Sequence, residues 1–86
     1  MARTFRATIS VSDKGEAKVP LASEIVEELG PRPGENLKAS MRGTEFTGRV
    51  AGSLRAPGLL IPEDVVRALG LREGQGVRLT VIGRAS

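Results

Sequence analysis

The chain lacks cysteine, histidine, tryptophan and tyrosine, and its only aromatic residues are two phenylalanines. Without cysteine or histidine it has no disulfide, no thiolate nucleophile, no histidine base and no zinc site of the usual ligands. With so few aromatic rings, stacking on nucleic-acid bases has almost no platform. We therefore expect a protein that is not an enzyme and that uses no metal or cofactor.

Long apolar runs are missing as well. No segment approaches the roughly 20 apolar residues that span a bilayer, and the N-terminal sequence MARTFRATIS has no apolar core of a secretory signal. We expect no membrane association and a cytoplasmic location. With 86 residues, 40% of them hydrophobic and 27% charged, the composition is that of one small folded domain covering 1–86.

What the sequence does contain is an internal repeat. The segments 5–45 and 46–86 align with one gap of a single residue, and the aligned positions share apolar residues and glycines but few charges. Two copies of one supersecondary unit, related by a pseudo-twofold axis, would share a core without sharing a surface role. The clearest matches are Phe5 with Phe46, Ile25-Val26 with Val65-Val66, Leu29-Gly30 with Leu69-Gly70, Gly34 with Gly74, and Gly43 with Gly83.

Each copy reads as strand, strand, helix, strand. In the first copy, alternation over 5–11 and 37–41 predicts strands, 17–20 is a short extended piece, and 22–29 has the apolar spacing of a helix. The second copy repeats this with strands at 46–52, 59–61 and 77–81 and a helix at 62–69, in which Pro62 is expected at the first helical position.

Six short strands and two short helices around one core predict a mainly β fold closed into a small barrel, because closure removes exposed sheet edges. The expected core comprises Phe5, Ile9, Ile25, Val26, Leu29, Leu37, Met41, Phe46, Val50, Val65, Val66, Leu69, Val77, Leu79 and Val81.

Fold motifs of this kind carry a resemblance to known families. They are Phe5-x-Ala7, the central run from Arg42 to Gly48, and a C-terminal motif of Ala68-Leu69-Gly70 followed by Glu73-Gly74. On these motifs the whole chain resembles a bacterial domain-of-unknown-function family with a double-psi β-barrel fold. The resemblance implies a six-stranded double-psi β-barrel of two interleaved repeats, in a single chain with no established catalytic residues.

A second, more distant resemblance is to the AbrB/MazE-like swapped-hairpin regulators, which looks strongest over PEDVVRALGLREGQGVRLTV. It implies DNA binding through basic residues on one face of a barrel that two chains complete. Here both halves stand in one chain, so we expect a monomer. The basic residues that would form such a face are not matched between the two copies.

The net charge is +3, and ten of the thirteen basic residues are arginine. Outward positions of the expected strands and of the irregular loop 53–58 make six of the basic residues candidates for phosphate or partner contacts: Arg6, Lys38, Arg42, Arg49, Arg55 and Arg78. The acidic pair Glu63-Asp64 is explained by the positive end of the helix dipole.

Two functional hypotheses follow. The first is a non-catalytic binding or interaction module for an unknown protein or a small anionic ligand. The alternative is a DNA-binding AbrB-like regulator or a non-specific nucleic-acid phosphate binder. The affinity for nucleic acid would be weak and salt-dependent, because it would depend only on contacts of arginine and lysine with phosphates.

Overall fold

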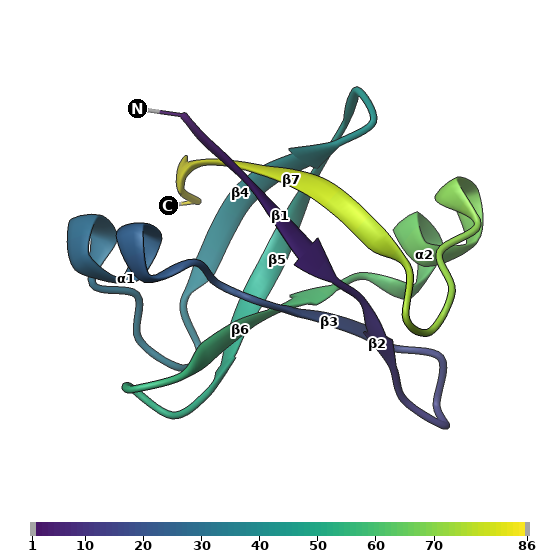
Figure 1. Ribbon diagram of the computed structural model, residues 1–86, viewed down its shortest axis with the longest axis horizontal. Coiled ribbons are helices and arrows are strands. Elements are labelled where there is room, and N and C mark those ends of the chain that lie inside the picture. The colour runs from purple at the N-terminus through teal and green to yellow at the C-terminus, as the bar shows by residue number, and fades with distance from the viewer. Residues whose placement is uncertain (1, 86) are drawn as a thin grey trace.

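The computed structural model describes residues 2–85 and contains a single curled antiparallel sheet with two short helices (Figure 1). The elements follow one another as β1 (Arg3–Thr8), β2 (Ser10–Val11), β3 (Ala17–Pro20), α1 (Ser23–Leu29), β4 (Asn36–Met41), β5 (Thr44–Gly52), β6 (Pro57–Ile61), α2 (Glu63–Leu69) and β7 (Gly76–Arg84). The mainly β class with two short helices is therefore confirmed.

The sheet has seven strands in the order β1-β7-β4-β5-β6-β3-β2, so the prediction of six strands is wrong. The difference lies at Ile9, where the single strand expected over 5–11 is interrupted. Its N–H donates to the carbonyl of Gln75 and its carbonyl accepts from the N–H of Gly74, both at 2.8 Å. Because both backbone groups bind the loop before β7, Ile9 leaves the ladder. The first and last strands of the sheet order, β1 and β2, are thus joined through this one residue.

Both helices end where the sequence predicts, at glycines in the left-handed conformation. Gly30 has φ 56° and ψ 49°, and Gly70 has φ 62° and ψ 41°. A left-handed position carries no penalty for glycine, which lacks a Cβ. Pro62, expected as the first helical residue, is instead the N-cap residue of α2, with an extended ψ of 146°.

The core confirms most of the expected residues. Eleven of them are buried: Ile9, Ile25, Leu37, Met41, Phe46, Val50, Val65, Val66, Val77, Leu79 and Val81. Phe5, Val26, Leu29 and Leu69 are corrections, because they pack against the core but remain partly exposed. The helices are short and lie beside the sheet rather than across its centre (Figure 1), so their inner faces are only partly covered. Phe5 lies on β1, at one end of the strand order.

The buried residues of β3 and β6 were not among the core residues predicted from the sequence. Val19 lies opposite Leu59 and Ala17 opposite Ile61, and all four are buried. These strands are too short to show a periodic pattern. Their burial results from the pairing of β3 in the first half with β6 in the second half. Three further buried hydrophobic residues were also not predicted: Leu21, Ala39 and Leu71.

The loops between helix and strand make the same backbone contacts in both halves. In the first half the N–H of Gly34 donates to the carbonyl of Val50, and the N–H of Val50 donates to the carbonyl of Glu35, both at 2.8 Å. In the second half the N–H of Gly74 donates to the carbonyl of Ile9, and the N–H of Ile9 donates to the carbonyl of Gln75, again both at 2.8 Å. Each loop is therefore hydrogen-bonded to a residue of the other half, Val50 within β5 in one case and Ile9 between β1 and β2 in the other.

Candidate anion-binding surface

Three of the six candidate basic residues come together on the outer surface of β1, β7 and β4. Arg6 on β1 lies directly opposite Arg78 on β7. Arg42 follows Met41, which pairs with Leu79, so Arg42 continues the same line on the far side of Arg78. Neighbouring strands lie about 4.8 Å apart, which places the three Cα atoms within roughly 10 Å. We call Arg6, Arg78 and Arg42 the arginine row.

Two shallow hollows flank Arg78 and are lined in part by the arginine row. One includes Arg6 and Thr8, and the other includes Arg42, Ser40 and Thr80. No acidic side chain lines either hollow among the residues that the structure describes. The space beside the row is therefore open to an incoming anion.

Hydroxyl groups form a second line parallel to the arginine row. The Thr4 and Thr80 hydroxyl oxygens are 2.8 Å apart, and Ser40 lies opposite Thr80 on the neighbouring strand. A hydroxyl both donates and accepts hydrogen bonds. These groups add neutral donors to the charged ones, a combination that protein surfaces commonly use to hold phosphate oxygens.

When no anion is bound, repulsion between the arginines of the row lowers the stability of the fold. Like charges directly opposite one another on neighbouring strands destabilise a sheet. Within residues 2–85 the ion pairs involve other basic residues, namely Arg3, Lys38, Arg67 and Arg84, and none involves Arg6, Arg42 or Arg78. An anion bound across Arg6 and Arg78 would relieve their repulsion.

Arg42 occupies an unusual backbone position. With Gly43 it forms the two-residue turn between β4 and β5, and the φ angles of the two residues are 52° and 81°. Two positive φ angles in such a turn favour Asn-Gly, and a left-handed arginine costs about 1–2 kcal/mol. The guanidinium Nη1 donates to the carbonyl of Leu69 at 3.1 Å, at the C-terminus of α2. This bond holds Arg42 beside the helix while leaving other N–H groups available, since a guanidinium has five.

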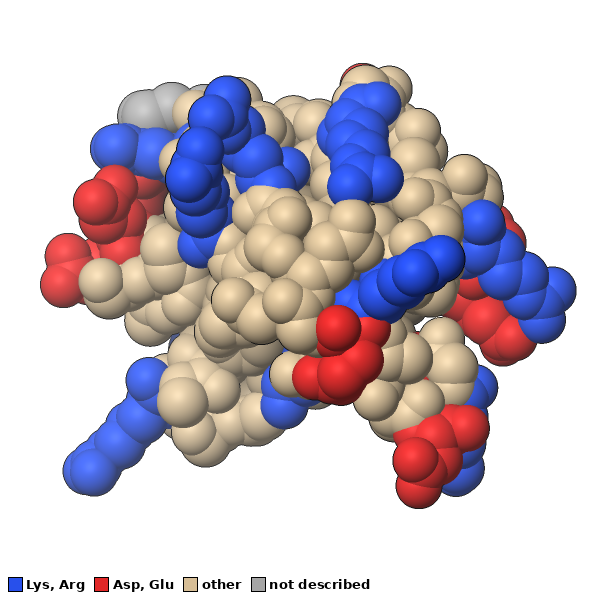
Figure 2. Space-filling view, turned by 45° about the vertical axis from the view of Figure 1, so that its right-hand side comes forward, with Lys and Arg blue, Asp and Glu red and all other residues tan. Residues whose placement is uncertain are grey.

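The other three candidates lie apart from the row. Lys38 points to the same face of β4 as Ser40 but forms an ion pair with Glu45 at 3.4 Å. Arg49 on β5 borders a different hollow that also contains Glu16 and Glu63. Arg55 lies in the loop between β5 and β6. Figure 2 shows Lys and Arg side chains spread over this face of the molecule, some beside Asp or Glu side chains and others over uncharged surface.

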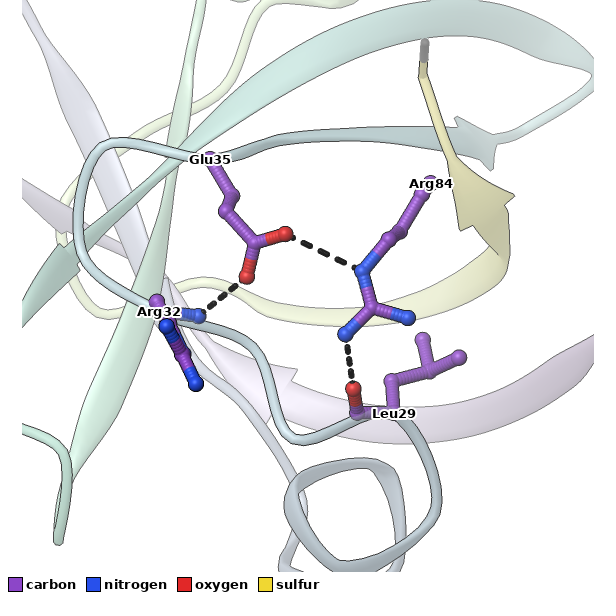
Figure 3. Close-up of polar contacts among 4 residues, drawn as sticks. All are labelled: Leu29, Arg32, Glu35 and Arg84. Atoms are coloured by element: carbon purple, nitrogen blue, oxygen red, sulfur yellow. Dashed lines mark hydrogen bonds and ion pairs between the residues drawn. The ribbon is translucent and has the colours of Figure 1, made fainter.

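A further polar cluster, which the sequence did not single out, joins α1 to the end of β7 (Figure 3). The Glu35 carboxylate accepts from the backbone N–H of Arg32 at 2.6 Å and from Nε of Arg84 at 3.0 Å. Arg84 also donates to the carbonyl of Leu29 at the end of α1. The Arg32 hydrogen bond, and then the Arg84 side chain, lower the pKa of Glu35 below its usual value.

This cluster serves to stabilise the fold, because its two charged side chains, Glu35 and Arg84, already bind each other. The second half keeps part of it, since Gln75 accepts from the backbone N–H of Arg72 at 2.9 Å. The equal spacing of Arg32 to Glu35 and of Arg72 to Gln75 was the available sequence signal. Nothing in the sequence pointed to Arg84, which is distant along the chain.

Residues 2–85 contain no group of three or more acidic side chains arranged to hold a metal ion. Neither of the helices in this part of the chain is long and apolar enough to cross a membrane. In comparisons with known proteins, no family model and no curated protein sequence matches this chain.

Proposed function

We propose that the protein is a non-catalytic binding module that holds phosphate-bearing anions on the arginine row. The observation that carries the proposal is the cross-strand pair Arg6 and Arg78, extended by Arg42 and without an acidic neighbour in the flanking hollows. A guanidinium matches phosphate in charge and in geometry. An arrangement that costs stability in the absence of an anion is expected where anion binding is the role of the surface.

Nucleic-acid backbones are the polymeric ligand that this surface suits, and we propose that they bind weakly and without sequence preference. Base stacking needs an exposed aromatic ring, whereas Phe46 is buried and Phe5 packs against the core. Base reading in the major groove normally uses a helix or a β-ribbon that enters it. The arginine row instead lies on the curved outer surface of a sheet, which can contact the phosphate backbone without entering a groove.

We further propose that the fold is a double-psi β-barrel, related to the domain-of-unknown-function family that the motifs resemble. Strands β1 and β4 pair with β7 and β5, and β3 pairs with β6, so strands of the two halves interleave. This pairing supports the proposal, and it also supports a monomer, since each half already receives the strands that a swapped-hairpin regulator borrows from a second chain. A cytoplasmic location stays an expectation from composition.

The test is fluorescence anisotropy with a labelled duplex DNA of random sequence at rising salt. If the three arginines each engage a phosphate, log affinity should fall against log salt with a slope of about −2.7. The variant Arg6→Gln/Arg78→Gln should bind more weakly, with a slope of about −0.9, because two phosphate contacts are gone.

The matched control is Arg32→Gln/Arg72→Gln, which removes the same net charge from two exposed loop positions. It should keep the slope of the unmodified protein. Equal weakening in both variants would mean that only net charge matters and would overturn the assignment of the site. Nanomolar binding to one sequence near physiological salt would instead favour the AbrB-like regulator, and a dimer on a sizing column would point the same way.

A further inference from the structure

The largest hollow described in the protein lies away from the arginine row, between α1, β3 and the loop before β6. Its volume is about 730 Å³, within the range of pockets that hold small organic molecules. The lining is mainly apolar and includes Leu21, Val26, Ala56 and Pro57. Leu54, the one exposed large apolar side chain among the described residues, belongs to the same loop between β5 and β6.

The shape of the hollow depends on Gly58. A Cβ at this position would lie 2.7 Å from Cε of Lys18 and 3.1 Å from the carbonyl oxygen of Val19. The aliphatic stem of Lys18 therefore lies directly over Gly58. This contact keeps the stem against the sheet and brings the lysine into the lining of the hollow.

The loop on the other side is also held in place. Ser53 accepts a hydrogen bond from the N–H of Ala56 at 3.1 Å, which fixes the turn that presents Arg55. Lys18 and Arg55 thus approach the same apolar space from two elements, and Glu27 is the only acidic residue in the lining. No ion pair in residues 2–85 involves Lys18, Arg55 or Glu27, so the two cations outnumber the acid and stay available.

We propose that this hollow is a second binding site, specific for a small organic anion with an apolar body, of the class of a medium-chain carboxylate. The apolar lining takes the hydrocarbon part, and the charges of Lys18 and Arg55 select the carboxylate. An inorganic phosphate would leave the apolar lining unused, and a neutral hydrocarbon would leave both cations without a partner. The site therefore differs in ligand class from the arginine row.

The experiment uses the full chain and follows backbone amide signals by two-dimensional NMR during titration with sodium octanoate, 1-octanol and sodium acetate. Octanoate should give saturable shifts at Leu21, Val26, Ala56 and Gly58. Octanol should bind about tenfold more weakly, the equivalent of about 1.4 kcal/mol, because the charge-assisted contacts are lost. Acetate should give no saturable shift over the same range.

Two variants separate the apolar and the charged contributions. Ala56→Phe adds a ring to an exposed position in the lining and should abolish binding of both octanoate and octanol, with unchanged signals from the core. Lys18→Gln/Arg55→Gln should lower octanoate affinity about tenfold and leave octanol unaffected. As the control, Arg6→Gln/Arg78→Gln should leave octanoate binding as it is.

Equal affinity for octanoate and octanol would overturn the selection of an anion. Shifts that map to β1 and β7, or no saturation at the four reporter amides, would overturn the site itself. The DNA titration of the arginine row is a separate measurement, so failure of the octanoate site and failure of the DNA-binding site can be told apart.

Discussion

The two halves of the chain share their backbone contacts and differ in their outer charges. On β1 and β7, Arg6 lies opposite Arg78, whereas the equivalent pair on β5 and β4 is Thr47 opposite Lys38. Lys38 is moreover neutralised by Glu45. The hydrogen bonds that fasten the loops are the same on both sides. Features that both halves keep thus serve the architecture, and the charge that only one side carries is where a function is to be sought.

The largest effect is expected from the two phenylalanines, which the alignment makes equivalent. Phe46 is buried, with 7% of its surface exposed, and Phe46→Ala should cost about 3–5 kcal/mol of unfolding free energy. Phe5 is only partly buried, so Phe5→Ala should cost about half as much. Urea denaturation of both variants measures the difference. Equal losses would show that the two rings are equally important, contrary to their exposure.

A second, smaller difference concerns Ala7 and Gly48, another equivalent pair. A Cβ on Gly48 would come within 2.7 Å of Cγ of buried Leu59 and within 2.8 Å of the carbonyl oxygen of Leu60. Gly48→Ala should therefore cost about 1–3 kcal/mol through overpacking. The reciprocal change Ala7→Gly should cost about 0.5–1 kcal/mol, because glycine loses more backbone entropy in a strand. Thermal unfolding of the two variants checks this order, and a stabilising Gly48→Ala would contradict the tight contact.

A third difference is pH dependence. In the folded state the pKa of Glu35 lies below its usual value of 4.5, chiefly because the N–H of Arg32 and the side chain of Arg84 hydrogen-bond the ionised form. Folding therefore favours the carboxylate, so its contribution to stability is present above about pH 4.5 and is lost as the pH falls through the lowered pKa. Glu35→Gln, which copies Gln75 of the second half, should lack this contribution.

The measurement is the urea midpoint of both proteins between about pH 7 and pH 3. The advantage of the unmodified protein over Glu35→Gln should shrink as the pH falls through the lowered pKa of Glu35. A constant difference over this range would show that the hydrogen bonds to Glu35 do not depend on its charge. Gln75→Glu should gain a weaker dependence of the same sign, since the N–H of Arg72 is the one hydrogen-bond donor that the structure describes at the Gln75 side chain.

Much of this architecture could be predicted from the sequence, because it rests on local rules. Leu-Gly at both helix ends and the alternation of apolar residues in the longer strands were sufficient for those elements. The interruption at Ile9 was not predictable, since it depends on backbone groups of Gly74 and Gln75 in the other half. The same is true of the partnership between Glu35 and Arg84.

The candidate surface was predictable only as a set of outward positions. Alternation placed Arg6 and Arg78 on the outside of their strands, but only the register of β1 against β7 brings them face to face. Arg49 lies on β5 and pairs with Asn36 on β4 and Leu60 on β6, away from Arg6 and Arg78, and pattern alone could not show this separation. Charges on a sheet thus need long-range pairing before they become a site.

The smallest expected effect on stability also bears most directly on function. Arg6→Thr gives β1 the residue that β5 carries at Thr47 and removes the repulsion with Arg78. Cross-strand pairs of this kind contribute about 0.2–1 kcal/mol, so the variant should be slightly more stable at low salt than the unmodified protein. The gain should fade as salt screens the original repulsion.

The same variant should bind duplex DNA more weakly, with the salt slope reduced by about 0.9. Stability and binding that change in opposite directions are expected when a charge is kept for a ligand at the expense of the fold. Thr47→Arg, which places an arginine opposite Lys38 and beside Glu45, is the mirror control and should not create a comparable gain in DNA affinity. If Arg6→Thr lowered both stability and affinity, the arginine pair would be a structural contact, and the anion site would have to lie elsewhere.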